Sequence, residues 1–330
     1  MTLKLGTIGT TWITQQFIEA AHATGEYVLT AVYSRRLESG QTFAAQFGEV
    51  PVFTELADML ASGLDVLYIA SPNSLHFEQV KAAIQADVHI IVEKSAFENP
   101  GQYAQIKALL TAHPSVRMFE AARHIQQPNF KALATKVAEM EQISGATFVY
   151  EKYSSRFDAY LAGENPNVLN REFAAGALAD LGIYPLYAAL RLFGMPVSQH
   201  YFATKLNNGT DGRGTAILRY TNFDVTLIFG KGANSYQHSE ILGLRDTILI
   251  DSIAELNQVE YDDGRGARTL LSTPVADNPM LDEAKLFADI IKQPVELANT
   301  YTDLLALSEQ VNAVLTKLRE DAGVVFPSDH

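Results

Sequence analysis

The stretch LKLGTIGTTW, Leu3 to Trp12, decides the fold of the first part of the chain. The apolar and β-branched residues up to Ile8 indicate a short strand, and Gly9 permits a tight turn directly after it. Ile13 and Phe17 then follow at four-residue spacing, which predicts a helix. A strand, a glycine turn and a helix in this order form the arrangement in which a helix N-terminus binds phosphate groups.

Strands and helices continue to alternate up to about residue 121. YVLTAVYS, LDVLYIA and HIIVEK indicate further strands, and RLESGQTFAAQFG and SLHFEQVKAAIQAD lie between them as helices. Thr54 is expected to cap the helix ELADMLAS, and Asn99 with Pro100 to begin another helix. This alternation is typical of βαβ units, so we expect a doubly wound parallel sheet, a Rossmann domain, over residues 1–121.

Residues 122–330 have a different pattern. GATFVYEKYSS, GRGTAILRY, FDVTLIFG, SEILGL and DTILID indicate strands joined by short turns, with helices at ALADLGIYPLYAALRLFG and LDEAKLFADIIK. We expect an α+β domain with an open-faced antiparallel sheet that serves substrate binding and oligomerisation. The apolar segments TAILRY and VTLIF favour a homodimer or tetramer formed through this sheet, and a monomer with the sheet covered by helices is the alternative.

Composition excludes several classes of protein. The formal net charge of −13 disfavours nucleic acid and membrane surfaces as partners, because binding phosphate backbones requires a basic face. The absence of cysteine excludes disulfides and thiolate metal sites, and the histidines show no spacing typical of metal ligands. No signal-peptide pattern and no apolar run of membrane-spanning length stand out, so a cytoplasmic protein is expected.

The turn after the first strand departs from the dinucleotide fingerprint. Aligned on its first glycine, the pattern that requires three glycines is filled here by Gly9, Thr11 and Thr14. The backbone amides at the start of the helix can still face a pyrophosphate, and an ordinary strand-to-helix turn is the alternative. The candidate cofactor-binding residues of this turn are Gly9, Thr10, Thr11, Trp12 and Ile13.

The end of the second strand bears on the choice of dinucleotide. NAD sites usually place an acid here, but the chain has Ser34, Arg35 and Arg36, and no acid occurs before Glu38. An arginine in this position can stack on adenine and pair with a 2′-phosphate. We therefore expect NADP(H) in preference to NAD(H), with two solvated arginines as the alternative.

Two later strands end in polar residues at the same predicted edge of the sheet. Since ligands lie at the carboxyl ends of parallel strands, we expect both ends to contact a nicotinamide. His76 is either part of this site or a polar residue at a helix start. The candidates are Ser71, Pro72, Asn73, His76, Glu93 and Lys94.

The motifs GTIGTTW, SPNSLH, EKSAFEN and GALADLGIYPL together resemble the glucose-fructose oxidoreductase, inositol dehydrogenase and MocA (Gfo/Idh/MocA) family over nearly the whole chain. The resemblance implies nicotinamide-dependent redox chemistry on sugars or polyols. It also implies that Lys94, Asp180 and Tyr184 are the catalytic residues. Tyrosine at 184 resembles the dihydrodiol-dehydrogenase branch. The chain departs from the family pattern at Ser95, where proline is usual, and in Ala174-Ala175-Gly176, where glycines are usual.

These residue types suit the transfer of a proton beside a hydride. A tyrosine is a poor base at its reference pKa of about 10. An ammonium such as that of Lys94, at about 4 Å and an effective dielectric of about 20, would favour the phenolate by about 4 kcal/mol, which lowers the tyrosine pKa by at most about three units. Lys94 can equally stabilise negative charge on the substrate oxygen, so the residue that takes the proton stays open. Asp180 would orient the substrate or Lys94. Candidate substrate-binding residues are Arg123, Arg156 and Arg171.

Two functions follow from these patterns. The first is an NAD(P)-dependent oxidoreductase acting on the carbonyl or secondary alcohol of a small sugar, polyol or cyclic diol. The second is a catalytically silent dinucleotide-binding sensor or interaction protein, which the incomplete glycine turn motivates.

Overall fold

The computed structural model describes residues 1–329, which form two compact units. The first unit comprises Met1–Arg123 together with Ala276–Ser308, and the second comprises His124–Val275 together with the chain from Glu309 onward. The sequence placed the whole of 122–330 in the second domain. The segment 276–308 lies instead in the first unit, because helix α9 (Leu281–Lys292) buries Phe287 and its neighbours in the core of that unit.

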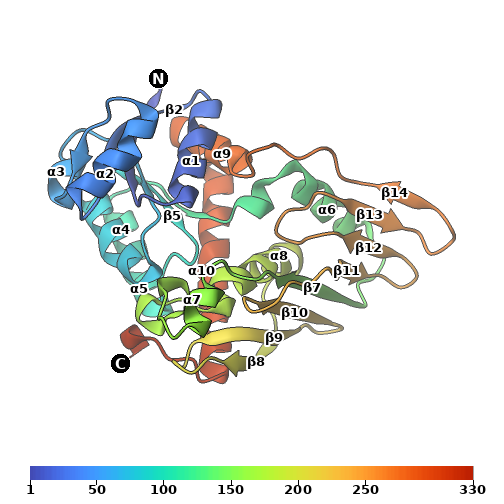
Figure 1. Cartoon of the computed structure of the whole chain (residues 1–330). Coiled ribbons are helices and arrows are strands. Elements are labelled where there is room, and N and C mark those ends of the chain that lie inside the picture. Colours follow the sequence, from blue (N-terminus) through green and yellow to red (C-terminus); the bar gives the residue numbers. More distant parts are fainter. Residues whose placement is uncertain (330) are drawn as a thin grey trace. The chain divides into compact units, whose positions relative to one another are not determined.

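The first unit contains a six-stranded parallel sheet, which confirms the predicted doubly wound fold (Figure 1). The strands in spatial order are β3 (Val52–Phe53), β2 (Tyr27–Tyr33), β1 (Leu3–Ile8), β4 (Val66–Ile69), β5 (His89–Glu93) and β6 (Met118–Ala121). The helices are α1 (Trp12–Ala23), α2 (Leu37–Ala44), α3 (Leu56–Leu60), α4 (His76–Gln85), α5 (Pro100–Ala112) and α9. The strand order reverses between β1 and β4, where such sheets bind ligands.

The helix starts were predicted with mixed success. Asn99 accepts a hydrogen bond from the Gln102 amide at 3.0 Å and Pro100 is the first residue of α5, as expected. The cap expected at Thr54 is wrong. Helix α3 begins after Glu55, whose side chain makes no capping hydrogen bond, so this helix is held by the burial of Met59 rather than by a cap.

Aromatic stacking closes the core on the α1 and α9 side of this sheet. The Phe17 ring from α1 stacks on Tyr68 from β4, with centroids 3.9 Å apart, and Phe287 from α9 stacks on Phe119 with centroids 4.5 Å apart. Tyr27 donates its hydroxyl to the Ala284 carbonyl at 2.7 Å. These contacts explain why α9, distant in sequence, belongs to the first unit.

The second unit contains an eight-stranded sheet (Figure 1). Its strands in spatial order are β14 (Arg268–Leu270), β13 (Val259–Asp262), β12 (Thr247–Ile250), β11 (Ser239–Leu242), β7 (Gly145–Glu151), β10 (Asp224–Gly230), β9 (Asp211–Arg219) and β8 (Ser198–Lys205). The expectation of an antiparallel sheet holds for every pair except β7 and β10, which are parallel. Other helices are α6 (Pro128–Glu139), α7 (Phe157–Leu161), α8 (Ile183–Phe193) and α10 (Ala298–Asp321), within which the division between the units falls.

The two faces of this sheet differ in burial. Phe148, Leu227 and Phe229 are fully buried on the face that packs against α8, whereas Ile217 and Ile228 on the opposite face are only partly buried. The helical stretch Arg171–Phe193 is long and apolar enough to cross a membrane, but most of its apolar residues are buried within the protein. Its apolar character is therefore that of a core helix.

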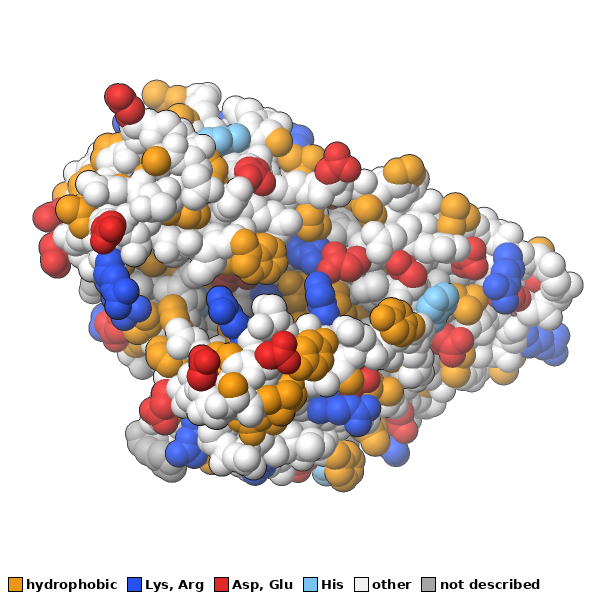
Figure 2. Space-filling view, in the orientation of Figure 1, with side chains coloured by type: hydrophobic (Ala, Val, Ile, Leu, Met, Phe, Trp, Pro, Cys, Tyr) orange, Lys and Arg blue, Asp and Glu red, His pale blue; other side chains and the backbone are white. Residues whose placement is uncertain are grey.

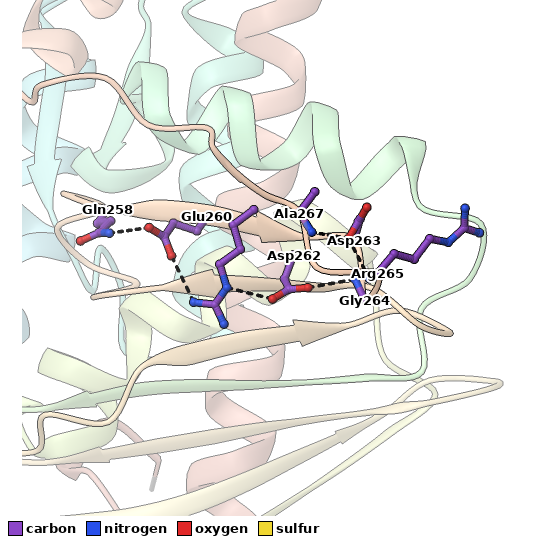
Figure 3. A network of polar contacts seen from close by, with 8 residues as sticks. Gln258, Glu260, Asp262, Asp263, Gly264, Arg265 and Ala267 are labelled. Carbon is purple, nitrogen blue, oxygen red and sulfur yellow. Dashed lines mark hydrogen bonds and ion pairs between the residues drawn. The ribbon is translucent and has the colours of Figure 1, made fainter.

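A polar network closes the hairpin between β13 and β14 (Figure 3). The Asp262 carboxylate accepts the Gly264 amide and the Arg268 Nε, each at 2.9 Å, and these hydrogen bonds lower the pKa of Asp262. Acidic and basic side chains are interspersed over the face seen in Figure 2, without a stripe of one sign.

Candidate active site

Gly9 brings the ends of β1 and β4 together. Its φ of +113° lies in the left-handed region, and a Cβ added there would stand 2.8 Å from the Ala70 carbonyl oxygen and 2.9 Å from Thr14 Oγ1. Any side chain at this position would collide with the loop that follows β4. The one glycine kept from the fingerprint is therefore the one that the close approach of two strand ends requires.

The start of α1 fits a pyrophosphate. Thr11 is the N-cap residue but its side chain makes no capping hydrogen bond, and Thr11 and Trp12 are exposed while Thr10 and Ile13 are half-buried. The first amides of a helix lack partners within the helix, and an anion can satisfy them. Thr14 Oγ1 is buried beside Gly9 without a hydrogen-bond partner among residues 1–329.

The end of β2 presents two cations. Ser34 donates its hydroxyl to the Arg36 carbonyl at 2.9 Å and its amide to the Phe53 carbonyl at 3.0 Å, so it shapes the turn. Arg35 and Arg36 are exposed, and neither forms an ion pair within the described chain. Both guanidinium groups are available to a phosphate.

His76 ties together the loops that follow β4 and β5. Its ring is fully buried, with Nδ1 3.1 Å from the Ser95 carbonyl oxygen and Nε2 2.9 Å from the Ser71 carbonyl oxygen. Ser71 also donates its hydroxyl to Gln79 at 2.6 Å, and Pro72 and Asn73 lie half-buried beside it. The neutral ring carries one N–H and donates to one of these carbonyls, and its contacts with both loops make His76 a residue that positions the site loops.

His76 should make the protein sensitive to acid. Burial lowers the pKa of His76 to about 4 from 6.5, although both carbonyls oppose the change. The unfolded chain then binds the proton more tightly, so this contribution to stability is complete above pH 6.5 and is lost as the pH falls toward 4. At about 1.36 kcal/mol per pH unit the loss is about 3 kcal/mol.

Urea unfolding of the wild type and of His76→Gln at pH 7 and pH 4.5 checks this. The wild type should lose more unfolding free energy than the variant between the two values, and exposed His238→Gln should behave as the wild type. Equal losses in the wild type and His76→Gln would contradict the assignment.

The end of β5 carries a buried acid and the candidate lysine. Tyr68 donates its hydroxyl to Glu93 Oε1 at 2.6 Å; burial raises the pKa of Glu93, and Lys94 opposes this. Lys94 is half-buried, and the peptide bond between it and Ser95 is cis.

Glu283 from α9, which sequence reasoning missed, is fully buried, and both of its carboxylate oxygens lack a partner among residues 1–329. Burial, and then the nearby Glu93, raise its pKa well above the usual range.

Asp180 and its partner belong to the second unit. Asp180 lies in a π-helical turn, Leu178–Gly182, that leads directly into α8. Asp180 Oδ2 lies 2.6 Å from the ammonium of Lys231, whose side chain is only 2% exposed. No motif in the sequence marks Lys231, because it follows a strand 51 residues later in the chain.

Asp211, also unmarked by any motif, anchors the start of the same turn. Its Oδ2 accepts the Leu178 amide at 2.6 Å and the Tyr201 hydroxyl at 2.7 Å, and burial raises its pKa. A Cβ on Gly176 would stand 2.0 Å from Asp211 Oδ1, so the one glycine left in Ala174-Ala175-Gly176 is the one that Asp211 requires. Ala174 adopts left-handed angles, with φ of 52°, without being glycine.

Tyr184 stands on the first turn of α8 among aromatic rings. Its carbonyl accepts a hydrogen bond from His124 Nε2 at 3.0 Å. Its ring centre lies 5.0 Å from that of His124 and 5.2 Å, edge to face, from that of Tyr150.

The candidate arginines differ in burial: Arg123 in the first unit is buried, Arg156 is exposed, and Arg171 is exposed with its Nε 3.6 Å from Glu172 Oε1. Within residues 1–329 no group of three acidic or histidine side chains is placed to hold a metal ion.

Two family profiles and several curated relatives match the chain. The profile of the "Oxidoreductase family, NAD-binding Rossmann fold" matches residues 3–120, and that of the "GFO/IDH/MocA C-terminal domain" matches residues 149–248. The chain is 38% identical to the "Uncharacterized oxidoreductase YgjR" of Escherichia coli (strain K12) over 99% of its own length and 98% of the relative's. It is 35% identical to "scyllo-inositol 2-dehydrogenase (NADP(+)) IolU" of Bacillus subtilis (strain 168) over 99% of each chain.

Solved structures show the same fold. A 3-ketoreductase from Actinomadura kijaniata, in complex with NADP and TDP-benzene, superposes with a TM-score of 0.85 at 19% identity, over 97% of this chain and 98% of the other. The resemblance expected from the motifs is confirmed by the two profiles and by full-length relatives. The chain therefore belongs to the Gfo/Idh/MocA family of oxidoreductases, whose first domain is an NAD-binding Rossmann fold.

Proposed function

We propose that this protein is an NADP(H)-dependent oxidoreductase that moves hydride between its cofactor and the carbonyl or secondary alcohol of a small sugar, polyol or cyclic diol. One observation carries the proposal. In a single parallel sheet, the Gly9 turn meets the loop after β4, and His76 joins that loop to the Glu93-Lys94 end of β5. The 35% identity to a scyllo-inositol 2-dehydrogenase (NADP(+)) supports a polyol as substrate and NADP as cofactor.

In this proposal residues of the chain carry out the proton transfer. A bound nicotinamide supplies the redox step. Either Tyr184 Oη exchanges the proton of the substrate hydroxyl while Lys94 Nζ stabilises negative charge on the oxygen, or Lys94 exchanges the proton itself. Asp180, held by Lys231, orients the substrate or Lys94. Arg171 and Arg123 are proposed as further contacts to the substrate.

Quenching of Trp12 fluorescence tests the cofactor assignment. Trp12 is the only tryptophan of the chain, is 72% exposed and begins α1, and reduced nicotinamide dinucleotides absorb where tryptophan emits. NADPH should quench Trp12 fluorescence with a lower midpoint than NADH. Arg35→Glu should raise the NADPH midpoint at least about tenfold, because it replaces a phosphate contact by repulsion, and should change the NADH midpoint little.

Exposed Arg265→Glu, in the hairpin between β13 and β14, is the matched charge control and should leave both midpoints unchanged. Equal effects of Arg35→Glu on NADPH and NADH would remove the argument from Arg35. Absence of quenching by either dinucleotide would contradict the cofactor site as a whole.

We further propose a cytoplasmic homodimer or tetramer. The absence of cysteine suits a reducing compartment. The partly exposed face that carries Ile217 and Ile228 is a surface that a second copy can bury. Small-molecule substrate and cofactor are the remaining partners in this proposal, with no nucleic acid and no membrane.

A further inference from the structure

Lys231 is a buried cation that no motif or established role accounts for. Its ammonium lies 2.6 Å from Asp180 Oδ2 and donates to the Val168 carbonyl at 2.8 Å, and its side chain is 2% exposed. Removing a charge from water is costly unless its partners are well placed. Here a carboxylate and a carbonyl satisfy it, so the position of Asp180 and the position of Val168 depend on the same group.

The backbone around Lys231 holds the other end of the segment that contains Val168. The Lys231 carbonyl accepts the Ser154 amide at 2.9 Å, and the Gly230 carbonyl accepts the Lys152 amide at 3.0 Å. A Cβ on Gly232 would stand 3.0 Å from the Phe157 ring, so the chain after β10 is packed directly against α7. The segment 152–168 is therefore fastened near both of its ends to residues 230–232.

The charges that face Lys231 come from three elements. Asp180 comes from the π-helical turn, and Asp211, at the start of β9, interacts with Lys231 through its buried charge and binds Tyr201 from β8. The pair formed by Arg213 Nε and Glu151 Oε1, 2.5 Å apart, lies beside Gly230 and is satisfied within itself. Of these groups, the Asp180 carboxylate contacts the ammonium directly, and its side chain is 36% exposed, so it can also meet a substrate.

We infer that Lys231 is a positioning residue that fixes the Asp180 carboxylate for catalysis and couples it to the segment 152–168. The inference rests on the proposed function, in which Asp180 orients the substrate or Lys94. Arg156, one of the candidate substrate contacts, lies on this segment. Movement of the segment on substrate binding would thus be transmitted to the catalytic carboxylate through one ammonium.

The test compares Lys231→Met, which keeps an unbranched side chain of similar size but removes the charge, with Lys231→Arg. In Lys231→Met we expect the acid limb of the kcat/KM profile to move up by about one pH unit, because a carboxylate without its cation is protonated at higher pH. Lys231→Arg should keep the limb in place but lower kcat about tenfold, because a planar guanidinium cannot reproduce both contacts. Lys205→Met, which removes an exposed lysine bound to the Gly323 carbonyl in the same unit, should leave the profile unchanged.

A second readout needs no activity. Trypsin should cleave native Lys231→Met after Lys152 and Arg156 at least about tenfold faster than wild type, since the charge-assisted contact that holds the segment is gone. Wild-type cleavage together with a wild-type acid limb would overturn the inference. If Lys231→Met does not fold, Lys231→Arg decides, and wild-type kcat and cleavage in that variant would equally overturn it. A wild-type protein that turns over no carbonyl would contradict the proposed function, while the cleavage result would still report on Lys231.

Discussion

Lys94→Ala should lower kcat for NADPH-dependent reduction by about 10²- to 10⁴-fold, the range that proton-transfer and charge-stabilising groups contribute. Lys94 follows the last residue of β5, so it stands at the ligand-binding edge of the parallel sheet. Both mechanisms proposed above require its ammonium at the substrate oxygen. The phosphate end of the site, at the start of α1, does not involve it, so the midpoint of Trp12 quenching by NADPH should change less than about twofold.

The measurement is the transfer of deuterium from 4-deuterated NADPH to a panel of ketoses, inososes and cyclic diketones. Lys81→Ala is the matched control, because Lys81 is a half-exposed lysine of the same unit, paired with Glu78 at 3.8 Å on α4. Wild-type rates in Lys94→Ala would show that Lys94 is not catalytic. Quenching of wild-type Trp12 without deuterium transfer to any member of the panel would favour the catalytically silent dinucleotide-binding protein.

Asp329→Ala should lower the free energy of unfolding by about 3 kcal/mol, although Asp329 is the penultimate residue of the chain. Arg319 on α10 is buried, and the Asp329 carboxylate is paired with its guanidinium group. Nη2 donates to Asp329 Oδ1 at 2.8 Å, and Nη1 bonds to Oδ2 and to the Val324 carbonyl. Removing the carboxylate breaks an ion pair with a buried guanidinium, which costs far more than losing a surface ion pair.

Further contacts depend on the same pair. Asp329 Oδ2 accepts the Phe326 amide at 2.7 Å, and the guanidinium carbon of Arg319 stands 4.1 Å from the centre of the Phe326 ring. Urea unfolding at pH 7 measures the loss. Exposed Glu320→Ala, on the same helix, should change stability by less than about 0.5 kcal/mol. An Asp329→Ala midpoint equal to that of Glu320→Ala would mean that the buried arginine is stabilised from elsewhere.

Much of the first unit was predictable because its signals are local. Alternating strand and helix patterns, the Gly9 turn and the Asn99-Pro100 helix start each act within a few residues, and the parallel sheet follows from them. The cap expected at Thr54 was a local error, and the other failures came from contacts between distant segments. Helix α9 joins the first unit through contacts of Ala284 with Tyr27 and of Phe287 with Phe119. Strand β10 pairs in parallel with β7, which lies far from it in the sequence.

The candidate site divides in the same way. Lys94, Asp180 and Tyr184 come from motifs, and their shared catalytic role stays a prediction. Lys231 and Asp211 carry no motif, because a buried charge is recognised only by what the folded chain places beside it.

By itself the sequence determined the family and the alternation of strands and helices that builds the parallel sheet, since these depend on local motifs and side-chain periodicity. Only the tertiary structure decided which cation holds Asp180, which acid lies buried behind β5 and which carboxylate neutralises Arg319. Each of these arrangements brings together residues from separate elements. The energy that selects them arises from burial, and burial exists only once the chain has folded.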